Sequence, residues 1–137
     1  MKKLLFVCIL LVAAMQFSFT TRHTAVADCT SAHEGTFTYS DNSGDEVVVA
    51  IKGDNYTEYH KDKKYTVESK IKWSGDCQAD LTLVKSTMPG YPHKAGVVIN
   101  VKIDKVEGDF IYYTAKVKGE SFKGSLKKQN TGETNHR

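Results

Sequence analysis

Residues 71–84 read Ile-Lys-Trp-Ser-Gly-Asp-Cys-Gln-Ala-Asp-Leu-Thr-Leu-Val, and this stretch decides the fold. Apolar and polar side chains alternate before Ser74 and again after Asp76, which is the period of a β-strand with one buried face. Between the two runs, Gly75 is expected to supply the positive φ that a tight hairpin turn needs. The stretch therefore predicts a β-hairpin, and it contains the only tryptophan of the chain, Trp73.

The same alternation extends in both directions from this hairpin. It predicts eight strands, at residues 35–39, 47–51, 56–60, 65–73, 77–83, 97–103, 111–117 and 122–126. Most of the connections are short and polar, and short connections favour antiparallel pairing of consecutive strands. The sequence therefore predicts an all-β fold, an eight-stranded antiparallel meander. Closure into an up-and-down barrel removes its edges, and a two-layer β-sandwich is the alternative.

Residues 1–27 have the composition of a secretory signal peptide. Lys2 and Lys3 precede an apolar run at residues 4–15, and Ala25-Val26-Ala27 offers the small side chains that signal peptidase requires. We expect cleavage after Ala27; cleavage after Ala14 and an uncleaved N-terminal anchor are the alternatives. The protein is then secreted or periplasmic, with no membrane span after cleavage. Residues 28–128 form a single barrel domain, and residues 129–137 form a polar tail that is predicted to be disordered.

The charge of residues 28–137 argues against nucleic acid as a partner. These residues contain 16 basic and 16 acidic side chains, and Arg137 is the only arginine among them. Phosphate and guanine contacts favour arginine, so we expect no nucleic-acid binding. Residues 28–85 carry a net charge of −4 and residues 86–137 one of +4. This asymmetry is compatible with a contact to another protein.

Two cysteines, Cys29 and Cys77, follow the predicted signal peptide. In an oxidising compartment, the simplest expectation is one disulfide between them. It would join the N-terminal segment to the central hairpin and close a loop of about 50 residues.

Several of these features resemble a group of small secreted bacterial proteins. The shared pattern is an early Cys29, Gly35-Thr36-Phe37 in a strand, and Trp73-Ser74-Gly75-Asp76-Cys77 followed by Leu81. The group has an Arg and a Gln-x-Glu in its second and third strands, where this chain has Lys52 and Thr57-Glu58-Tyr59. The resemblance implies a lipocalin-like fold, in a group without a settled function. Some members carry a DNA topoisomerase IV name, a chemistry that this chain, without a P-loop or a basic face, does not support.

The sequence contains no arrangement typical of a catalytic or metal site. No serine lies in a Gly-x-Ser-x-Gly turn, and no histidine is placed beside a nucleophile by its spacing. Asp104, Glu107 and Asp109 lack the spacing of a calcium loop, and Met88 and His93 are too few ligands for copper. We therefore expect a protein that is not an enzyme and has no metal or cofactor.

Aromatic side chains on the predicted inward faces mark the candidate ligand-binding residues. Small inward residues alternate with them, at Ser69, Ala79, Ala115 and Gly124. The inward rings proposed to contact a ligand are those of Tyr39, Tyr65, Trp73, Tyr113 and Phe122. Such an interior either fills a tapering core, the marginally preferred interpretation, or leaves a cavity for one small apolar ligand. We expect Trp73 to be buried near strand 35–39.

The loop from Ser86 to Lys94 is the longest break between the predicted strands and contains both prolines. Long loops on a rigid scaffold often carry binding residues, so Tyr91 is added to the ligand-binding candidates. The sequence thus favours a monomeric, lipocalin-like binding protein that holds a small apolar ligand. The alternative is an interaction or inhibitor module that binds a protein partner through its outer face and this loop.

Overall fold

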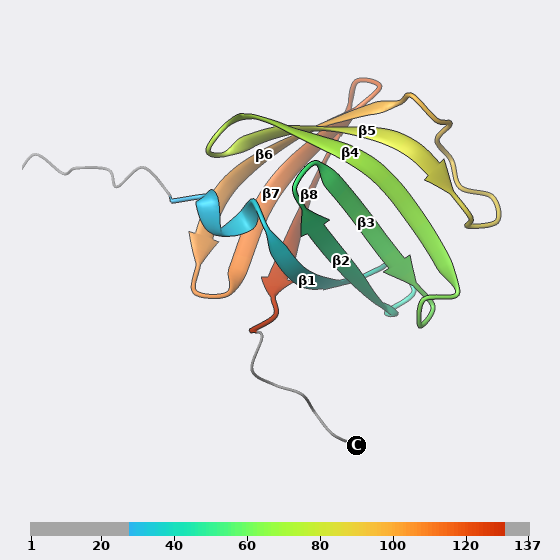
Figure 1. Ribbon diagram of the computed structural model, residues 1–137, viewed down its shortest axis with the longest axis horizontal. Coiled ribbons are helices and arrows are strands. Elements are labelled where there is room, and N and C mark those ends of the chain that lie inside the picture. Colours follow the sequence, from blue (N-terminus) through green and yellow to red (C-terminus); the bar gives the residue numbers. More distant parts are fainter. Residues whose placement is uncertain (1–27, 131–137) are drawn as a thin grey trace, which may run out of the picture.

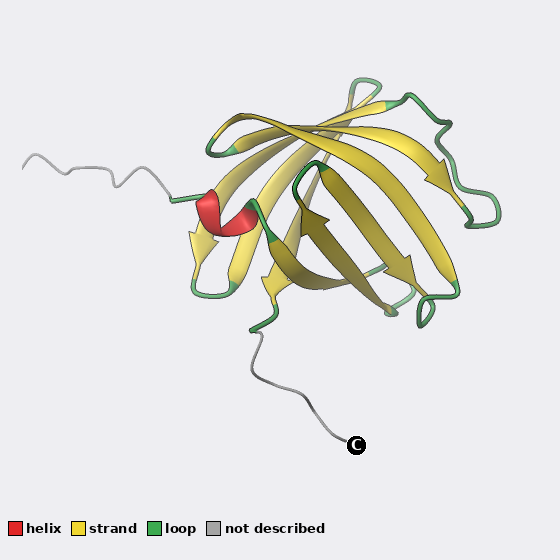
Figure 2. Ribbon diagram, viewed as in Figure 1, coloured by secondary structure: helices red, strands yellow, loops and turns green. Residues whose placement is uncertain are grey.

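The computed structural model describes residues 28–130, and most of them belong to β-strands (Figure 2). The predicted signal peptide (residues 1–27) and residues 131–137 of the predicted tail lie outside the described residues. A short 3₁₀-helix, η1 (Thr30–Ala32), precedes eight strands. These are β1 (Gly35–Ser40), β2 (Glu46–Lys52), β3 (Asn55–His60), β4 (Tyr65–Gly75), β5 (Gln78–Ser86), β6 (Val98–Glu107), β7 (Phe110–Val117) and β8 (Glu120–Lys128).

Each strand pairs antiparallel with the next, and β8 pairs with β1 to close a barrel (Figure 1). The predicted eight-stranded antiparallel barrel is confirmed, and the alternative sandwich is wrong. Closure gives β1 and β8 a partner on both sides, as an up-and-down barrel requires. Within residues 28–130, no helix is long and apolar enough to cross a membrane.

The central hairpin forms where it was predicted, with one difference at its turn. Trp73 pairs with Ala79, and Ile71 with Leu81, so β4 and β5 are in the register that the alternation required. Gly75, however, does not have a positive φ; it is the last residue of β4 and pairs with Gln78. A register shift between Trp73 and Gly75 bends the strand, because a bulge increases the local twist. The turn itself therefore consists of Asp76 and Cys77 and needs no left-handed glycine.

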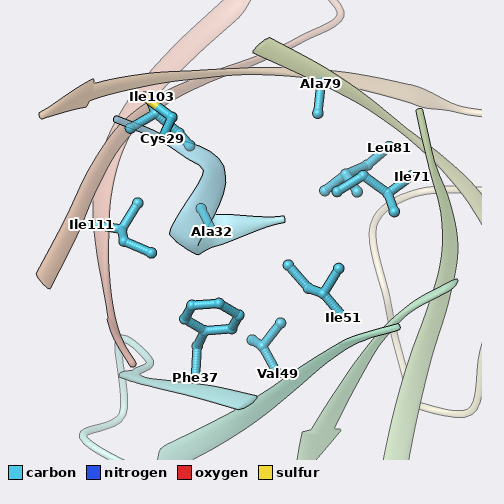
Figure 3. Packing of buried hydrophobic residues seen from close by; sticks show 10 residues of the cluster. All are labelled: Cys29, Ala32, Phe37, Val49, Ile51, Ile71, Ala79, Leu81, Ile103 and Ile111. Carbon is cyan, nitrogen blue, oxygen red and sulfur yellow. The ribbon is translucent and has the colours of Figure 1, made fainter. Parts of the chain in front are cut away.

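The apolar inward residues form one core inside the barrel. Figure 3 shows ten of them, contributed by Cys29, η1 and six of the strands, with their side chains directed into the interior. They are Cys29, Ala32, Phe37, Val49, Ile51, Ile71, Ala79, Leu81, Ile103 and Ile111. Phe37 is the largest side chain that is fully buried. Burial of these side chains is the main favourable term for the fold.

One end of the barrel is covered by the segment that contains η1 (left in Figure 1). Cys29 and Cys77 form the predicted disulfide, with their Cα atoms 5.2 Å apart. His33 Nε2 lies 2.7 Å from the carbonyl oxygen of Asp76, and the His33 ring stacks on Trp73 with centroids 3.8 Å apart. Trp73 is only half-buried, and the ring that stacks on it belongs to His33 of this segment and not to β1.

The junction of β1 and β8 is the shortest pairing in the barrel. Only Phe37 and Thr38 pair with β8, opposite Lys128 and Lys127. Gln129 extends the junction, since its backbone N–H donates to Thr36 O at 2.8 Å and its side chain donates to Thr38 Oγ1 at 2.8 Å. The disordered tail was predicted to begin at residue 129, and this start is too early, because hydrogen bonds hold Gln129 against β1.

Candidate functional site

The barrel interior contains a cavity of about 260 Å³. Most of its wall is aliphatic, from side chains such as Ile51, Ile71, Leu81 and Val101. The small inward residues Ala79 and Ala115, which were expected beside the rings, also line it. The interior is therefore not completely filled, and the preferred sequence-based interpretation of a filled core is wrong for this part of the barrel.

A polar cluster is centred on Glu58, which lines the cavity. Tyr56 donates its hydroxyl hydrogen to Glu58 Oε1 at 2.8 Å, and Tyr39 donates to Glu58 Oε2 at 3.1 Å. His60 Nε2 lies 2.9 Å from the same Oε2 and acts as a donor, because a carboxylate only accepts. We call Glu58, Tyr39, Tyr56 and His60 the Glu58 cluster.

Strand register explains how this cluster forms. Glu58 pairs with Val49 on one side and Val67 on the other, and both valines are buried. Cross-strand partners share a face, so Tyr56, Glu58 and His60 all point inward at alternate positions of β3. One strand therefore places a carboxylate, a phenol and an imidazole on the buried face.

The tyrosines near Glu58 are held in their neutral form. Burial, and then the Glu58 carboxylate, raise the pKa of Tyr39 and of Tyr56 well above the ordinary value, and they raise that of Tyr113 in the same way. Burial and Glu58 raise the pKa of Tyr91 to about 12. Each of these hydroxyls therefore remains a hydrogen-bond donor at neutral pH.

The loop between β5 and β6 lies at the opposite end of the barrel from η1 (right in Figure 1). It contributes Tyr91 and His93 to the cavity wall, and their rings meet edge to face with centroids 5.9 Å apart. The loop is anchored where it leaves the sheet, because Gly96 N–H donates to Leu83 O at 2.8 Å and Leu83 N–H donates to Val97 O at 2.9 Å. The loop is thus fixed at its base, and it directs the rings of Tyr91 and His93 into the cavity.

The structure brings together five of the six residues proposed to contact a ligand. Tyr39, Trp73, Tyr91, Tyr113 and Phe122 line the cavity, although Phe122 is 49% exposed. Tyr65 does not line this cavity. It is the first residue of β4 and pairs with His60 at the end of the barrel, and Lys64 Nζ lies 5.2 Å from its ring centroid.

Sequence reasoning missed the acidic residue of the site. The strand containing Glu58 has Thr57 and Tyr59 on one face and Tyr56, Glu58 and His60 on the other. Neither face is clearly apolar, so the sequence alone did not indicate which one is buried. The register of β3 with β2 and β4 decides which face is buried. A prediction of the strand pairing that placed Glu58 opposite Val49 and Val67 would have put Glu58 on the inward face.

Two buried nitrogen atoms in the cavity wall have no hydrogen-bond partner within residues 28–130. They are Trp73 Nε1, which can only donate, and His93 Nδ1. An unpaired buried polar group is costly unless a partner is supplied.

A second depression lies on the barrel surface where β1 and β8 separate. Its volume is about 780 Å³, and it is lined by Thr38, Ser40 and Asp41 on one side and by Lys123 to Ser125 and Lys127 of β8 on the other. Tyr39, Tyr113 and Phe122 line both this cleft and the interior cavity. The β1–β8 cleft therefore adjoins the cavity through three aromatic side chains.

Comparison of the chain with protein-family models, curated proteins and solved structures finds no match. No group of three or more His, Cys, Asp or Glu side chains that could hold a metal ion occurs within residues 28–130.

Proposed function

We propose that this protein is a secreted, lipocalin-like binding protein that holds one small, largely apolar molecule in its barrel. The observation that carries the proposal is the cavity of about 260 Å³, with aliphatic walls and a few convergent polar groups. Ligand pockets in proteins combine these two features, and this cavity is slightly smaller than the roughly 300–1,000 Å³ that is usual for them. The disulfide is compatible with an oxidising compartment outside the cytoplasm.

The proposal is tested with a neutral, polarity-sensitive dye and with Trp73 fluorescence. Trp73 is the only tryptophan of the chain and lines the cavity, so a bound molecule should change its emission. The variant Ala79→Leu adds three carbon atoms to the cavity wall, where Ala79 is 2% exposed. We expect it to weaken dye binding at least about tenfold, because it fills the space that the dye would occupy.

The matched control is Ala50→Leu, on the outward face of β2. Ala50 pairs with Thr36 and Thr57 and is absent from the cavity wall. The Ala50→Leu variant should bind the dye as tightly as the wild type does. Equal binding by Ala79→Leu and the wild type, or no dye binding at all, would contradict the proposal. Native and denaturing mass spectrometry of the purified protein would identify a molecule that co-purifies.

A protein partner at the outer face is the second candidate function. Val84 and Val98 are 45% and 43% exposed, and both lie beside the loop between β5 and β6. Because Val98 pairs with Thr82, the two valines are diagonal neighbours on the outward face. A partner that binds here should lose affinity when both are replaced by lysine, while dye binding inside the barrel stays unchanged.

A further inference from the structure

The cavity wall carries one carboxylate, that of Glu58, and the imidazole that contacts it belongs to His60, whose Nε2 lies 2.9 Å from Oε2. Of the described residues that line the cavity, Glu58 is the only acidic one, and none is a lysine or an arginine. A bound anion would lie near a carboxylate of the same sign in a poorly hydrated space, which is costly. The lining therefore disfavours fatty acids and other carboxylates as ligands.

Glu58 retains the capacity to accept another hydrogen bond. Oε2 accepts from Tyr39 and His60, whereas Oε1 accepts from Tyr56 alone. A carboxylate offers about four acceptor positions, two on each oxygen. One position on Oε1 is therefore open to an N–H or O–H donor, and the Glu58 side chain is 18% exposed, so a bound molecule can reach it.

Aromatic rings gather around this carboxylate from four parts of the chain. Tyr39 comes from β1, Tyr56 from β3, Tyr113 from β7 and Tyr91 from the loop between β5 and β6, and all four line the cavity. The hydroxyl ends of Tyr39 and Tyr56 are directed at the carboxylate, since their oxygens lie 3.1 Å and 2.8 Å from Glu58 Oε2 and Oε1. A phenol oxygen that donates its hydrogen can still accept a hydrogen bond. The carboxylate and the phenol oxygens thus favour a ligand that donates hydrogen bonds and carries positive charge.

The rest of the cavity sets the size and polarity of the ligand body. Val67 lies beside Glu58, and Trp73 is six residues further along β4, which is about 20 Å of strand. The wall between them is mainly aliphatic. A cavity of 150 Å³ holds benzene, so by proportion 260 Å³ suits a molecule of roughly ten non-hydrogen atoms.

We propose that the cavity recognises a small organic cation of roughly ten non-hydrogen atoms in all, a protonated primary amine on an apolar body. Its ammonium group binds Glu58 Oε1 among the four tyrosine rings, and its apolar body extends along the aliphatic wall toward Trp73. This inference rests on the proposed binding function and adds the chemical class of the ligand.

The experiment compares three probes of similar size and different charge: phenethylamine, phenethyl alcohol and phenylacetate. Binding to the mature protein is measured at neutral pH by Trp73 fluorescence and by calorimetry. We expect the amine to bind at least about tenfold more tightly than the alcohol, and the carboxylate to bind most weakly. Because this series uses the wild-type protein, the test does not depend on how well a variant folds.

The variant Glu58→Gln removes the charge and keeps an oxygen that can accept from the tyrosines. It should abolish the preference for the amine and change the affinity for the alcohol by less than about threefold. Glu68→Gln is the matched control, since Glu68 lies on the outward face of neighbouring strand β4, where its Oε1 is 3.3 Å from Lys85 Nζ. This control should retain the full preference.

The outcomes separate this inference from the function on which it rests. If the alcohol binds in the cavity but the amine is not preferred, or if phenylacetate binds best, the inference is overturned and the binding function stands. If neither the dye nor any of the three probes binds, both are overturned. An amine preference that persists in Glu58→Gln would place the cation elsewhere and would also overturn the inference.

Discussion

Gly124 and Tyr113 illustrate how single residues shape the cavity. The two pair across β7 and β8, and a Cβ atom placed on Gly124 would lie 2.5 Å from the Tyr113 hydroxyl oxygen and 2.6 Å from its Cζ. The missing side chain therefore provides the space that the Tyr113 ring occupies. Tyr113 in turn lines both the cavity and the β1–β8 cleft.

Gly124→Ala should destabilise the protein by about 1–3 kcal/mol, because the methyl group displaces a partly buried ring. The measurement is chemical denaturation followed by circular dichroism. Gly75→Ala is the matched control: its Cβ would meet nothing within 4 Å and its φ is not positive, so a change within about 0.5 kcal/mol is expected. Equal stabilities of the two variants would contradict the proposed packing.

The tyrosines around Glu58 should make stability fall at alkaline pH. The pKa of Tyr39, Tyr56, Tyr91 and Tyr113 is higher in the folded chain than the ordinary value of 10.0. The unfolded state therefore releases these protons first, and the stability they contribute is present below pH 10 and lost as the pH rises above it.

Phenolate absorbance of the folded protein should show delayed ionisation of four of the seven tyrosines. Tyr39→Phe should remove one delayed group and leave the others. Ionisation of all seven tyrosines near pH 10 in the folded protein would contradict the burial of this cluster.

At the scale of the element, the loop between β5 and β6 decides how the barrel closes at one end. Its base is fixed by hydrogen bonds to Leu83, and Tyr91 N–H donates to Met88 O at 3.4 Å within it. The local bonds involve backbone atoms, so they do not depend on the Tyr91 side chain. The ring is then free to serve as a wall of the cavity.

Tyr91→Ala should leave the melting temperature within about 3 °C of the wild type, because the ring makes few contacts with the main core. Its affinity for the neutral dye should fall at least about fivefold, since the variant opens the cavity at this end. A fall of many degrees in melting temperature with unchanged dye binding would show that Tyr91 has a structural role alone.

At the scale of the whole molecule, the disulfide joins two segments 48 residues apart and holds η1 over one end of the barrel. Loss of a crosslink of this length increases the entropy of the unfolded chain by an amount worth on the order of 4 kcal/mol. The same segment carries His33, whose ring covers Trp73.

Replacing both Cys29 and Cys77 by serine should therefore lower the free energy of unfolding by about 4 kcal/mol, measured by denaturant titration. Trp73 emission should also shift to longer wavelength as the segment loosens. Thiol titration of the denatured, unreduced wild-type protein should find no free thiol from Cys29 and Cys77. Detection of these two thiols would contradict the crosslink.

The sequence determined the local features of this protein. A two-residue period requires one buried face, so the eight strands, their inward apolar residues and the antiparallel order followed from the pattern and the short connections. The disulfide followed from the number of cysteines beyond the predicted signal peptide. Tyr39, Trp73 and Tyr113 were found because each shares the inward face of its strand with an apolar residue two positions before it.

Only the tertiary structure decided how the interior is used. Whether large and small side chains fill a barrel depends on which of them meet across it, and that is set by strand register and by the closure of β8 on β1. Glu58 became part of the site because its strand pairs with Val49 and Val67, and it is joined there by Tyr39 and Tyr113 from strands distant in sequence. Contacts of this kind are long-range, so no local pattern in the sequence specifies them.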